Sequence, residues 1–468
     1  MSENSGKQVY SIFIIILSLT CVIAANVSSD LFILTGSISL VLFFAFCIAI
    51  YKRQQYFFFL VLPFLFPQFT AIVSNFSLET GAFIEELKVT SYATGGATRL
   101  VFFVLSFFFV ALVVFRFIDK YRVNRFFFIL RGDYSKLERQ LIFIVAGLIF
   151  LALTVNAMIW GSPLLKGVQR FDYWTAHPYP SFRNLLYQGY LLSFILGVYI
   201  TKSKLITQQK SWKYIFLVLC FCLFNIVYGE KFTGVFLTLL YFFVGFFGAL
   251  VLYKKINVVN GKNIIFVLIV GLLLYGLIYY QYKYIHQLPG SIFSFIESRV
   301  LNLQGEVWWA IDRKDHNVSA LSYLYKYSSD CTETGGLYYL MYQIAPASMV
   351  DSYCQRGITF TMGYPAILLP TAGYLLGYVF NLLFAALVGV TLFLIKKSIE
   401  FPNVISLFLS AKVLLIETHA FNMGNIYNIL DIKFFAYFIL LLFFSELRLK
   451  NAQIGSHVPA SIPSGQAK

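Results

Sequence analysis

The chain has 468 residues, of which 59% are hydrophobic and only 12% are charged. A soluble globular protein carries about 25% charged residues, so the charged side chains here are too few to cover a water-facing surface. The composition excludes an ordinary soluble domain and predicts an all-α protein that crosses a membrane many times.

Apolar runs of membrane-spanning length recur along the whole sequence. A helix needs about 20 mainly apolar residues to cross the hydrocarbon layer. The run at 214–229 is short and the run at 402–419 contains Lys412, so these two fit least well. With them included, we expect about twelve transmembrane helices, at 10–28, 31–50, 56–75, 98–118, 140–160, 184–201, 214–229, 233–253, 263–283, 366–395, 402–419 and 430–447.

The net charge of +15 comes from Lys and Arg residues that cluster in short loops between the apolar runs. These loops fall on one side of the membrane if the N-terminus is cytoplasmic, which is the pattern of the positive-inside rule. Both termini are then expected in the cytoplasm, and the charge gives no reason to expect nucleic-acid binding. The outer loops would be 76–97, 161–183, the turn at Gly229-Glu230-Lys231, 284–365 and 420–429.

This topology divides the chain into four parts. Residues 1–283 would hold nine spans with short loops, and 284–365 would form one large outer loop between spans nine and ten. Residues 366–450 would hold spans ten to twelve. The tail 451–468, rich in Ser, Pro, Gly and Ala, is expected to be disordered.

The first third of the large loop has the pattern of an amphipathic helix over 292–313. Its apolar residues recur at helical spacing, while Arg299, Glu306 and Arg313 stand seven residues apart along one edge. Such a helix would lie in the membrane interface and hold guanidinium groups at the depth of lipid phosphates. The alternative is that these three residues form only a solvated polar edge.

The rest of the loop is rich in aromatic residues. Trp308, Trp309, Tyr338 and Tyr339 offer flat apolar faces with polar tips, which suit sugar rings, although anchoring at the membrane interface is the alternative. Two further pairs of side chains suggest chemistry in this loop. His286 and His316 are candidate proton acceptors or else solvent-facing histidines, and Cys331 and Cys354 would form a disulfide if this side is oxidising.

Cationic side chains gather at the expected outer face, where ionisable groups at membrane depth usually have a partner or a function. A cationic pocket there, roofed by an aromatic loop, is what a lipid-linked diphosphate sugar would need. The outer loops contain no Asp-x-Asp pair and no His/Cys cluster, so we expect neither a metal ion nor a cofactor. The cations are Arg99, Arg170, Lys231, Arg299, Arg313 and Arg356.

Three local stretches carry a family resemblance: Arg299-Val-Leu-Asn-Leu-Gln-Gly305-Glu-Val-Trp308-Trp309, Gly229-Glu230-Lys231-Phe232 and Met362-Gly363-Tyr364-Pro365. With a dozen spans, many Phe and Tyr residues and a dominant late outer loop, the chain resembles the Wzy-type O-antigen polymerases, within the group of O-antigen polymerases and ligases. The Arg-x10-Gly spacing of some polymerases is not found after Arg170, Arg299 or Arg313.

The resemblance implies a GT-C-like glycosyltransferase in the bacterial inner membrane, with the large loop in the periplasm. It would join undecaprenyl-diphosphate-linked oligosaccharides among the membrane lipids, without a metal. Arg299 and Lys231, followed by Arg170, would stabilise the leaving diphosphate. The base stays open among His286, His316, Glu306 and Glu230.

Two other activities remain open at this point. An O-antigen ligase would have a similar topology and a different acceptor, and a flippase or transporter for lipid-linked oligosaccharides would move the same substrates. Transporters usually show repeated halves and mid-membrane sites, and no repeat is evident here. The sequence does not decide whether a chain-length regulator protein is a partner.

Overall fold

Helices make up nearly all of the regular structure. The computed structural model describes residues 3–26, 31–121, 128–131, 135–203, 212–230, 232–254, 301–314, 321–328, 330–331, 334–445 and 447–450, with isolated residues between 272 and 291. The long helices are α1 (Glu3–Ala25), α2 (Phe32–Arg53), α3 (Gln55–Glu79), α4 (Gly96–Lys120), α5 (Ser135–Trp160), α8 (Arg183–Lys202), α9 (Trp212–Val227), α10 (Phe232–Lys254), α16 (Leu368–Glu400), α17 (Val404–Met423) and α19 (Ile432–Ser445).

Shorter elements connect these helices. The short helices are α6 (Pro163–Lys166), α7 (Arg170–Ala176), η2 (Pro180–Phe182), α13 (Glu306–Asp312), η5 (Leu321–Leu324), α14 (Gly336–Ile344), α15 (Ala347–Gln355) and α18 (Tyr427–Leu430). Two strand pairs complete the described chain: the antiparallel pair β1 (Phe83–Ile84) and β2 (Val89–Thr90), and the parallel pair β3 (Phe128–Arg131) and β4 (Leu447–Lys450).

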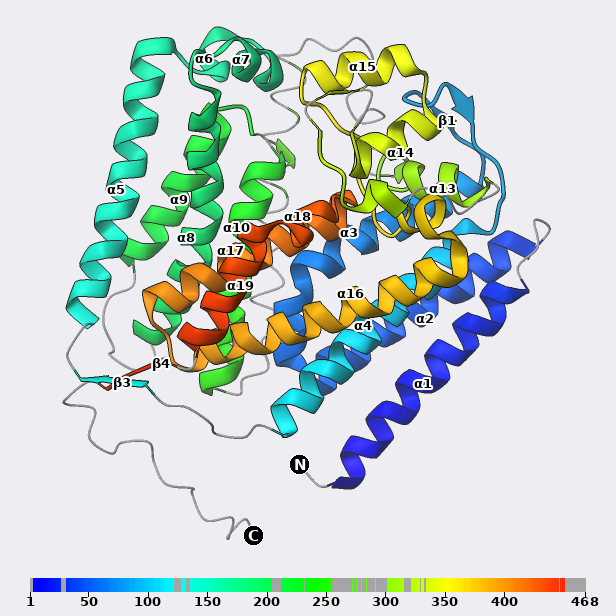
Figure 1. Cartoon of the computed structure of the whole chain (residues 1–468), viewed down its shortest axis with the longest axis horizontal. Helices are drawn as coiled ribbons and strands as arrows, with labels where there is room; N and C mark the ends of the chain where they lie inside the picture. The colour runs from blue at the N-terminus through cyan, green and yellow to red at the C-terminus, as the bar shows by residue number, and fades with distance from the viewer. Residues whose placement is uncertain are drawn as a thin grey trace.

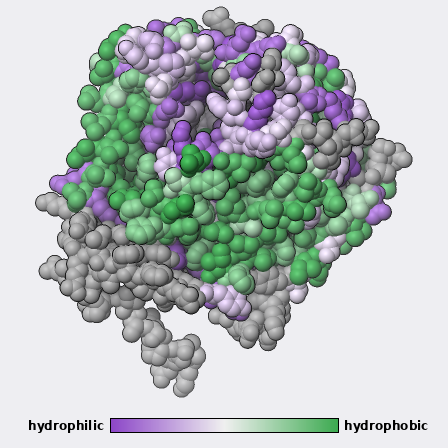
Figure 2. All heavy atoms as spheres, viewed as in Figure 1, coloured by the Kyte–Doolittle hydropathy of each residue, from purple (hydrophilic) through white to green (hydrophobic). Residues whose placement is uncertain are grey.

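The protein is a multi-pass membrane protein. Within the described residues, eight helical stretches are long and apolar enough to cross a bilayer, and three shorter apolar helices lie in α1, α9 and α19. Large apolar side chains such as Leu148, Met158 and Ile439 are exposed. Figure 2 shows a broad hydrophobic band with hydrophilic residues gathered above it. Such a band would promote aggregation in water, but lipid covers it in a membrane.

The predicted all-α membrane architecture is therefore confirmed, whereas the number of twelve spans stays a prediction. Every expected span except the ninth coincides with a described helix. The ninth, 263–283, lies almost entirely outside the described residues.

The two ends of the helix bundle differ (Figure 1). One end, which we call the loop end, holds α6, α7, α13, α14 and α15; the other, which we call the terminal end, holds the start of α1 and the β3–β4 pair. At the terminal end Lys396 pairs with Asp119 at 2.6 Å. The loop end holds the polar clusters described below.

Among the described helices, α8 and α10 pack closely. A Cβ atom at Gly197 would lie 2.4 Å from Phe242 O, and one at Gly245 would lie 2.2 Å from Phe194 O. Glycine at both positions lets the two backbones touch, as small residues do at helix interfaces in membranes. Because α8 begins at Arg183 and α10 begins just after Glu230, this contact also holds those two residues near each other.

Candidate functional site

Glu230 lies at the centre of a cationic cluster at the loop end. Arg170 donates from Nη1 to Glu230 Oε2, and Arg183 donates from Nε to Oε1 at 3.0 Å. The glutamate is 3% exposed, whereas the arginine side chains are 24% and 27% exposed. Each carboxylate oxygen therefore has its own guanidinium, and each guanidinium still reaches the surface.

A tight turn brings these residues together. Gly229 has φ +72, a left-handed conformation that glycine adopts without strain. The N–H of Glu230 bonds to Asn225 O at 2.8 Å, which reverses the chain after α9. A Cβ at Gly229 would lie 3.2 Å from Arg170 Cβ, so a larger residue would push α7 away. The turn thus presents Glu230 to α7 and to the start of α8.

Aromatic rings support the two guanidinium groups. The Cζ of Arg170 lies 4.5 Å from the centre of the Phe171 ring, and the Cζ of Arg183 lies 5.9 Å from the rings of Phe171 and Tyr187. Cation–π contacts of this kind fix the planes of the guanidinium groups. Within the described part of the chain, two arginines share one carboxylate, which leaves one net positive charge and free N–H donors for an anion.

The surface is hollowed beside this cluster. Figure 2 shows a hollow with hydrophilic residues around it, and the matching view in Figure 1 places it over the upper end of α10, between α7 and the α14–α15 region. The start of α10 directly follows Glu230. A ligand in the hollow would therefore meet the side of the bundle that carries the two arginines.

A second ion pair ties α7 to the end of α15. Arg356 donates from Nε to Asp172 Oδ1 at 3.0 Å and from Nη2 to Gln169 Oε1 at 3.4 Å. Both side chains of the pair are well exposed. Arg356 is a predicted diphosphate ligand; its observed contacts hold α7 against the described residues between 301 and 367, which we call the loop-end segment.

Arg99, another predicted diphosphate ligand, is engaged inside the protein. Its guanidinium donates to both oxygens of Asp312, with Nη2 2.5 Å from Oδ2, and to Thr94 O at 2.7 Å. The Asp312 side chain is fully buried and also accepts from the Tyr374 hydroxyl at 2.8 Å. A buried carboxylate thus engages Arg99, and its role as a diphosphate ligand stays a prediction.

The predicted interfacial helix over 292–313 is wrong in its described part. Residues 302–305 form turns, and α13 begins only at Glu306. Gly305 packs directly on α3: its N–H donates to Ser74 Oγ at 2.7 Å, and a Cβ there would lie 2.4 Å from Asn75 N. This contact ends the helical pattern, and every residue of α13 is buried.

Burial changes the predicted roles of three α13 side chains. Trp308 donates from Nε1 to Gly96 O at 2.8 Å, and Trp309 donates from Nε1 to Tyr92 O at 2.9 Å. Both indoles are at most 2% exposed and Glu306 is 0% exposed. The two tryptophans pack the loop-end segment onto α4 and do not offer faces to a glycan. Glu306 does not lie on a solvated helix edge.

Arg313 lies exposed just after α13. Its Cζ is 4.4 Å from the centre of the Trp309 ring and 5.8 Å from that of Tyr92. The guanidinium thus lies against aromatic rings. Neither of these contacts involves a residue of the Arg170–Glu230–Arg183 cluster.

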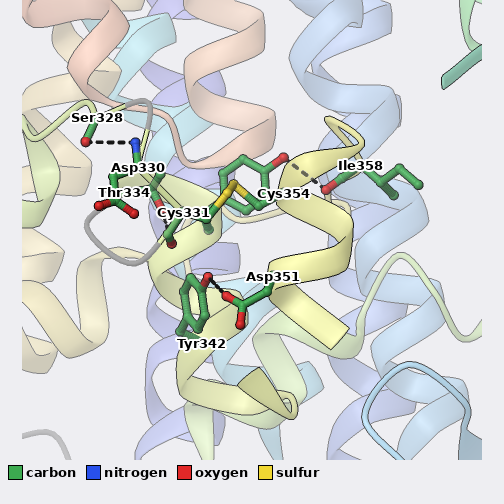
Figure 3. The surroundings of a disulfide bond; sticks show 9 residues. Ser328, Asp330, Cys331, Thr334, Tyr342, Asp351, Cys354 and Ile358 are labelled. Atoms are coloured by element: carbon green, nitrogen blue, oxygen red, sulfur yellow. Dashed lines mark hydrogen bonds between the residues drawn. A yellow bond between two sulfur atoms is a disulfide. The ribbon is translucent and has the colours of Figure 1, made fainter. Parts of the chain in front are cut away.

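Cys331 and Cys354 form the expected disulfide, which joins the chain before α14 to the end of α15 (Figure 3). Tyr342 points toward Asp351 in the same region and donates to its Oδ1 at 2.5 Å. Tyr338 donates to Ile358 O at 3.1 Å, and burial raises the pKa of Tyr338 to about 12. These hydroxyls therefore stay protonated as hydrogen-bond donors near neutral pH.

Tyr339 remains part-exposed and stacks on Tyr323, with ring centres 4.0 Å apart. Tyr325 and Tyr327 nearby in sequence are 63% and 73% exposed. Exposed tyrosine faces therefore occur at the loop end, on residues other than the predicted tryptophans.

Four predicted site residues lie outside the described residues: His286, Arg299, His316 and Lys231. The sequence analysis did not single out Arg183, the last residue of the expected outer loop 161–183. An arginine at the start of an apolar run was the available signal, because a charge at membrane depth usually has a partner or a function.

The comparison with protein families finds a match over part of the chain. The model of DUF6418, a family of unknown function, matches residues 330–438. This stretch runs from the disulfide through α14 to α18 and into α19. The search of the curated proteins found no match, and neither did the search of the solved structures. The family match leaves the Arg170–Glu230–Arg183 cluster outside it.

Proposed function

We propose that this protein is a membrane glycosyltransferase of the O-antigen polymerase type, which joins undecaprenyl-diphosphate-linked oligosaccharides. The observation that carries the proposal is the Arg170–Glu230–Arg183 cluster, where two part-exposed guanidiniums share one buried carboxylate beside a hydrophilic hollow. Arginine presents a planar fork of N–H donors that matches phosphate oxygens. The hollow borders the hydrophobic band, so a lipid tail and its diphosphate have adjacent surfaces to occupy.

In the proposed reaction, a hydroxyl oxygen of the incoming repeat attacks the anomeric carbon of the growing glycan. The bond from that carbon to the diphosphate oxygen breaks, and undecaprenyl diphosphate leaves with the electron pair. Arg170 and Arg183 stabilise the negative charge that develops on the leaving oxygen. The hydroxyl proton passes to a base, for which Glu230, His286 and His316 remain candidates, whereas Glu306 is buried.

The proposed location is the bacterial inner membrane, with the loop end in the periplasm and both termini in the cytoplasm. Lys52, Arg53, Lys120 and Lys396 support this orientation, because they follow or end helices on the cytoplasmic side of the expected topology. A ligase or a transporter of lipid-linked oligosaccharides would share this topology. The cluster at one end of the bundle favours interfacial chemistry over transport through the midplane.

A genetic experiment separates these activities. We expect that deleting the gene, in a host that makes the matching glycan, leaves lipopolysaccharide with core plus a single repeat. Persistent long chains would contradict the proposed function. Loss of all glycan from the core would favour the ligase or transporter instead.

Binding of the leaving group tests the cluster directly. Purified protein in nanodiscs should bind undecaprenyl diphosphate, and Arg170→Gln and Arg183→Gln should each weaken binding about tenfold or more, because a charge-assisted hydrogen bond contributes about 1.5–3 kcal/mol. The matched control is Lys396→Gln, which removes an ion-paired cation at the terminal end. Equal affinities for all three variants would remove the cluster from the proposed site.

A further inference from the structure

A small, partly open cavity lies where α3, α4, α16 and α17 meet. Its lining includes Gln68, Asn422 and Tyr364 together with Phe64, Phe107 and Phe421. The volume that the centre of a water molecule can occupy is about 10 Å³. Gln68 is 5% exposed and lies near the middle of α3. The lining is mostly aromatic, with the amides of Gln68 and Asn422 among it, and about 10–15 Å³ by this measure is the space that one water molecule needs.

Proline explains why Asn422 points into this region. Pro67 has no N–H, so the carbonyl of Pro63, one helical turn earlier in α3, lacks its usual donor. Asn422 Nδ2 donates to that carbonyl at 3.2 Å. Neighbouring side chains commonly satisfy backbone groups freed by proline in membrane helices.

The orientations of both amide groups follow from these contacts. Asn422 Nδ2 binds Pro63 O, and Gln68 Nε2 binds Tyr364 O at 3.1 Å. A carbonyl oxygen can only accept, so each NH₂ group must point to it and each amide oxygen must point elsewhere. Gln68 Oε1 and Asn422 Oδ1 are both shielded from solvent, and neither accepts a hydrogen bond from any residue in the described ranges.

The other polar groups of the cavity are already satisfied. The Tyr364 hydroxyl donates to Asn381 Oδ1 at 2.5 Å, and Asn381 Nδ2 donates to Phe103 O at 3.0 Å. Two residues that line the cavity thus each carry a buried amide oxygen that needs a donor. A ligand that fits these groups is small and neutral and can donate two hydrogen bonds.

We propose that this cavity is a binding site for one water molecule, which donates one hydrogen to Gln68 Oε1 and the other to Asn422 Oδ1. A monovalent cation would also meet two amide oxygens there. However, the cavity is lined by aromatic rings and amides and by no carboxylate, so the charge of a cation would go unbalanced at this depth.

The water site links three parts of the molecule. Gln68 belongs to α3, Asn422 belongs to α17, and Gln68 also holds the carbonyl of Tyr364, where the loop-end segment turns into α16. A water molecule here bridges α3 to α17 directly beneath that junction. The site goes beyond the proposed transfer reaction, since it needs no lipid-linked substrate.

An electron cryo-microscopy map at a resolution that shows water molecules tests the proposal. For the full chain in nanodiscs, we expect one density peak within hydrogen-bond distance of both oxygens, in sodium chloride and in choline chloride alike. A cavity without density would overturn the proposal. So would a peak that requires sodium, accompanied by a higher melting temperature in sodium than in choline, because this would make it a cation site.

Substitution gives a second test. Gln68→Met keeps the side-chain length and removes the acceptor, so the peak should vanish and the melting temperature should fall. Thr70→Val is the matched control, because Thr70 bonds to Pro67 O in its own helix and does not line the cavity. A peak that persists in Gln68→Met would contradict the bridging role of Gln68. If that variant fails to fold, the wild-type map still decides.

Discussion

At the scale of single residues, the carboxylate of Glu230 keeps two guanidiniums together in a part-buried site. In Glu230→Gln the arginines would repel each other while losing their charged acceptor. Because the arginines are about one-quarter exposed, solvent screens part of the effect, and we expect a loss of about 2 kcal/mol in the free energy of unfolding. The measurement is the temperature at which the purified protein loses its monodisperse chromatographic peak.

Asp172→Asn provides the matched control for this prediction. It also removes a carboxylate from an arginine pair at the loop end, but the side chains of Asp172 and Arg356 are 49% and 38% exposed. An exposed pair contributes about 0–1 kcal/mol. Equal shifts for the two variants would show that burial of Glu230 does not matter to the cluster.

The sequence predicted the kinds of residue at the loop end better than their contacts. It singled out Arg170, Glu230 and Arg99 because charges are rare among apolar runs. It could not predict that Arg99 would meet Asp312, which lies 213 positions away. Periodicity and hydropathy describe residues that are close along the chain. An ion pair between distant residues leaves no local pattern, although it determines which contacts a cationic side chain makes.

At the scale of elements, the contact between α8 and α10 determines the distance between Arg183 and Glu230. In Gly245→Ala the new Cβ would lie 2.2 Å from Phe194 O, which is backbone and cannot move without moving α8. We expect the variant to lose about 1–3 kcal/mol of stability, as overpacking does. It should also weaken binding of undecaprenyl diphosphate, because α8 begins with Arg183 and α10 begins just after Glu230.

Gly147→Ala is the control for the helix contact. Gly147 lies within α5, and a Cβ there would meet nothing within 4 Å. Alanine in a helix interior is more favourable than glycine by about 0.5–1 kcal/mol, so this variant should be as stable as the wild type or slightly more so. The measurement is the thermal midpoint of Gly245→Ala and Gly147→Ala side by side. Equal midpoints would refute the packing argument.

The stretch at 292–313 shows where a periodic pattern misleads. Val307 and Ile311 do face a protein core, as their spacing predicts, but Glu306 and Asp312 are buried as well. The apolar stripe predicted a helix with one solvent-facing side, whereas α3, α4, α14 and α16 pack around α13 and bury all of its residues. Gly305 is the residue that ends the pattern, because only glycine fits against the backbone of α3 at Asn75.

At the scale of the whole molecule, hydropathy predicted most of the architecture. Long apolar runs must become helices in a membrane, so the positions of α2, α3, α4, α10, α16 and α17 follow from the sequence with small shifts at their ends. The hollow beside the cluster does not follow from the sequence. It arises from the way α7 and the α14–α15 region stand apart above α10, and that arrangement depends on packing between distant segments.

The loop-end segment is fastened to the bundle at several separate points. Gly305 binds α3, Asp312 binds Arg99, and Arg356 binds Asp172 of α7. The disulfide Cys331–Cys354 adds a constraint within the segment, closing a loop with a sequence separation of 23 residues. Its removal should therefore loosen α14 and α15 while the fastening at Gly305 and Asp312 keeps α13 in place.

For the double variant Cys331→Ser/Cys354→Ser, we expect a loss of about 3 kcal/mol, from the loop-closure entropy that the disulfide removes from the unfolded state. Limited proteolysis should produce new cleavage between 331 and 364, while the membrane helices stay intact. Cys21→Ser, at an exposed free cysteine, should change neither readout. If the double variant were as resistant to protease as the wild type, the contacts of Arg356 and Tyr338 would suffice to hold the segment without the disulfide.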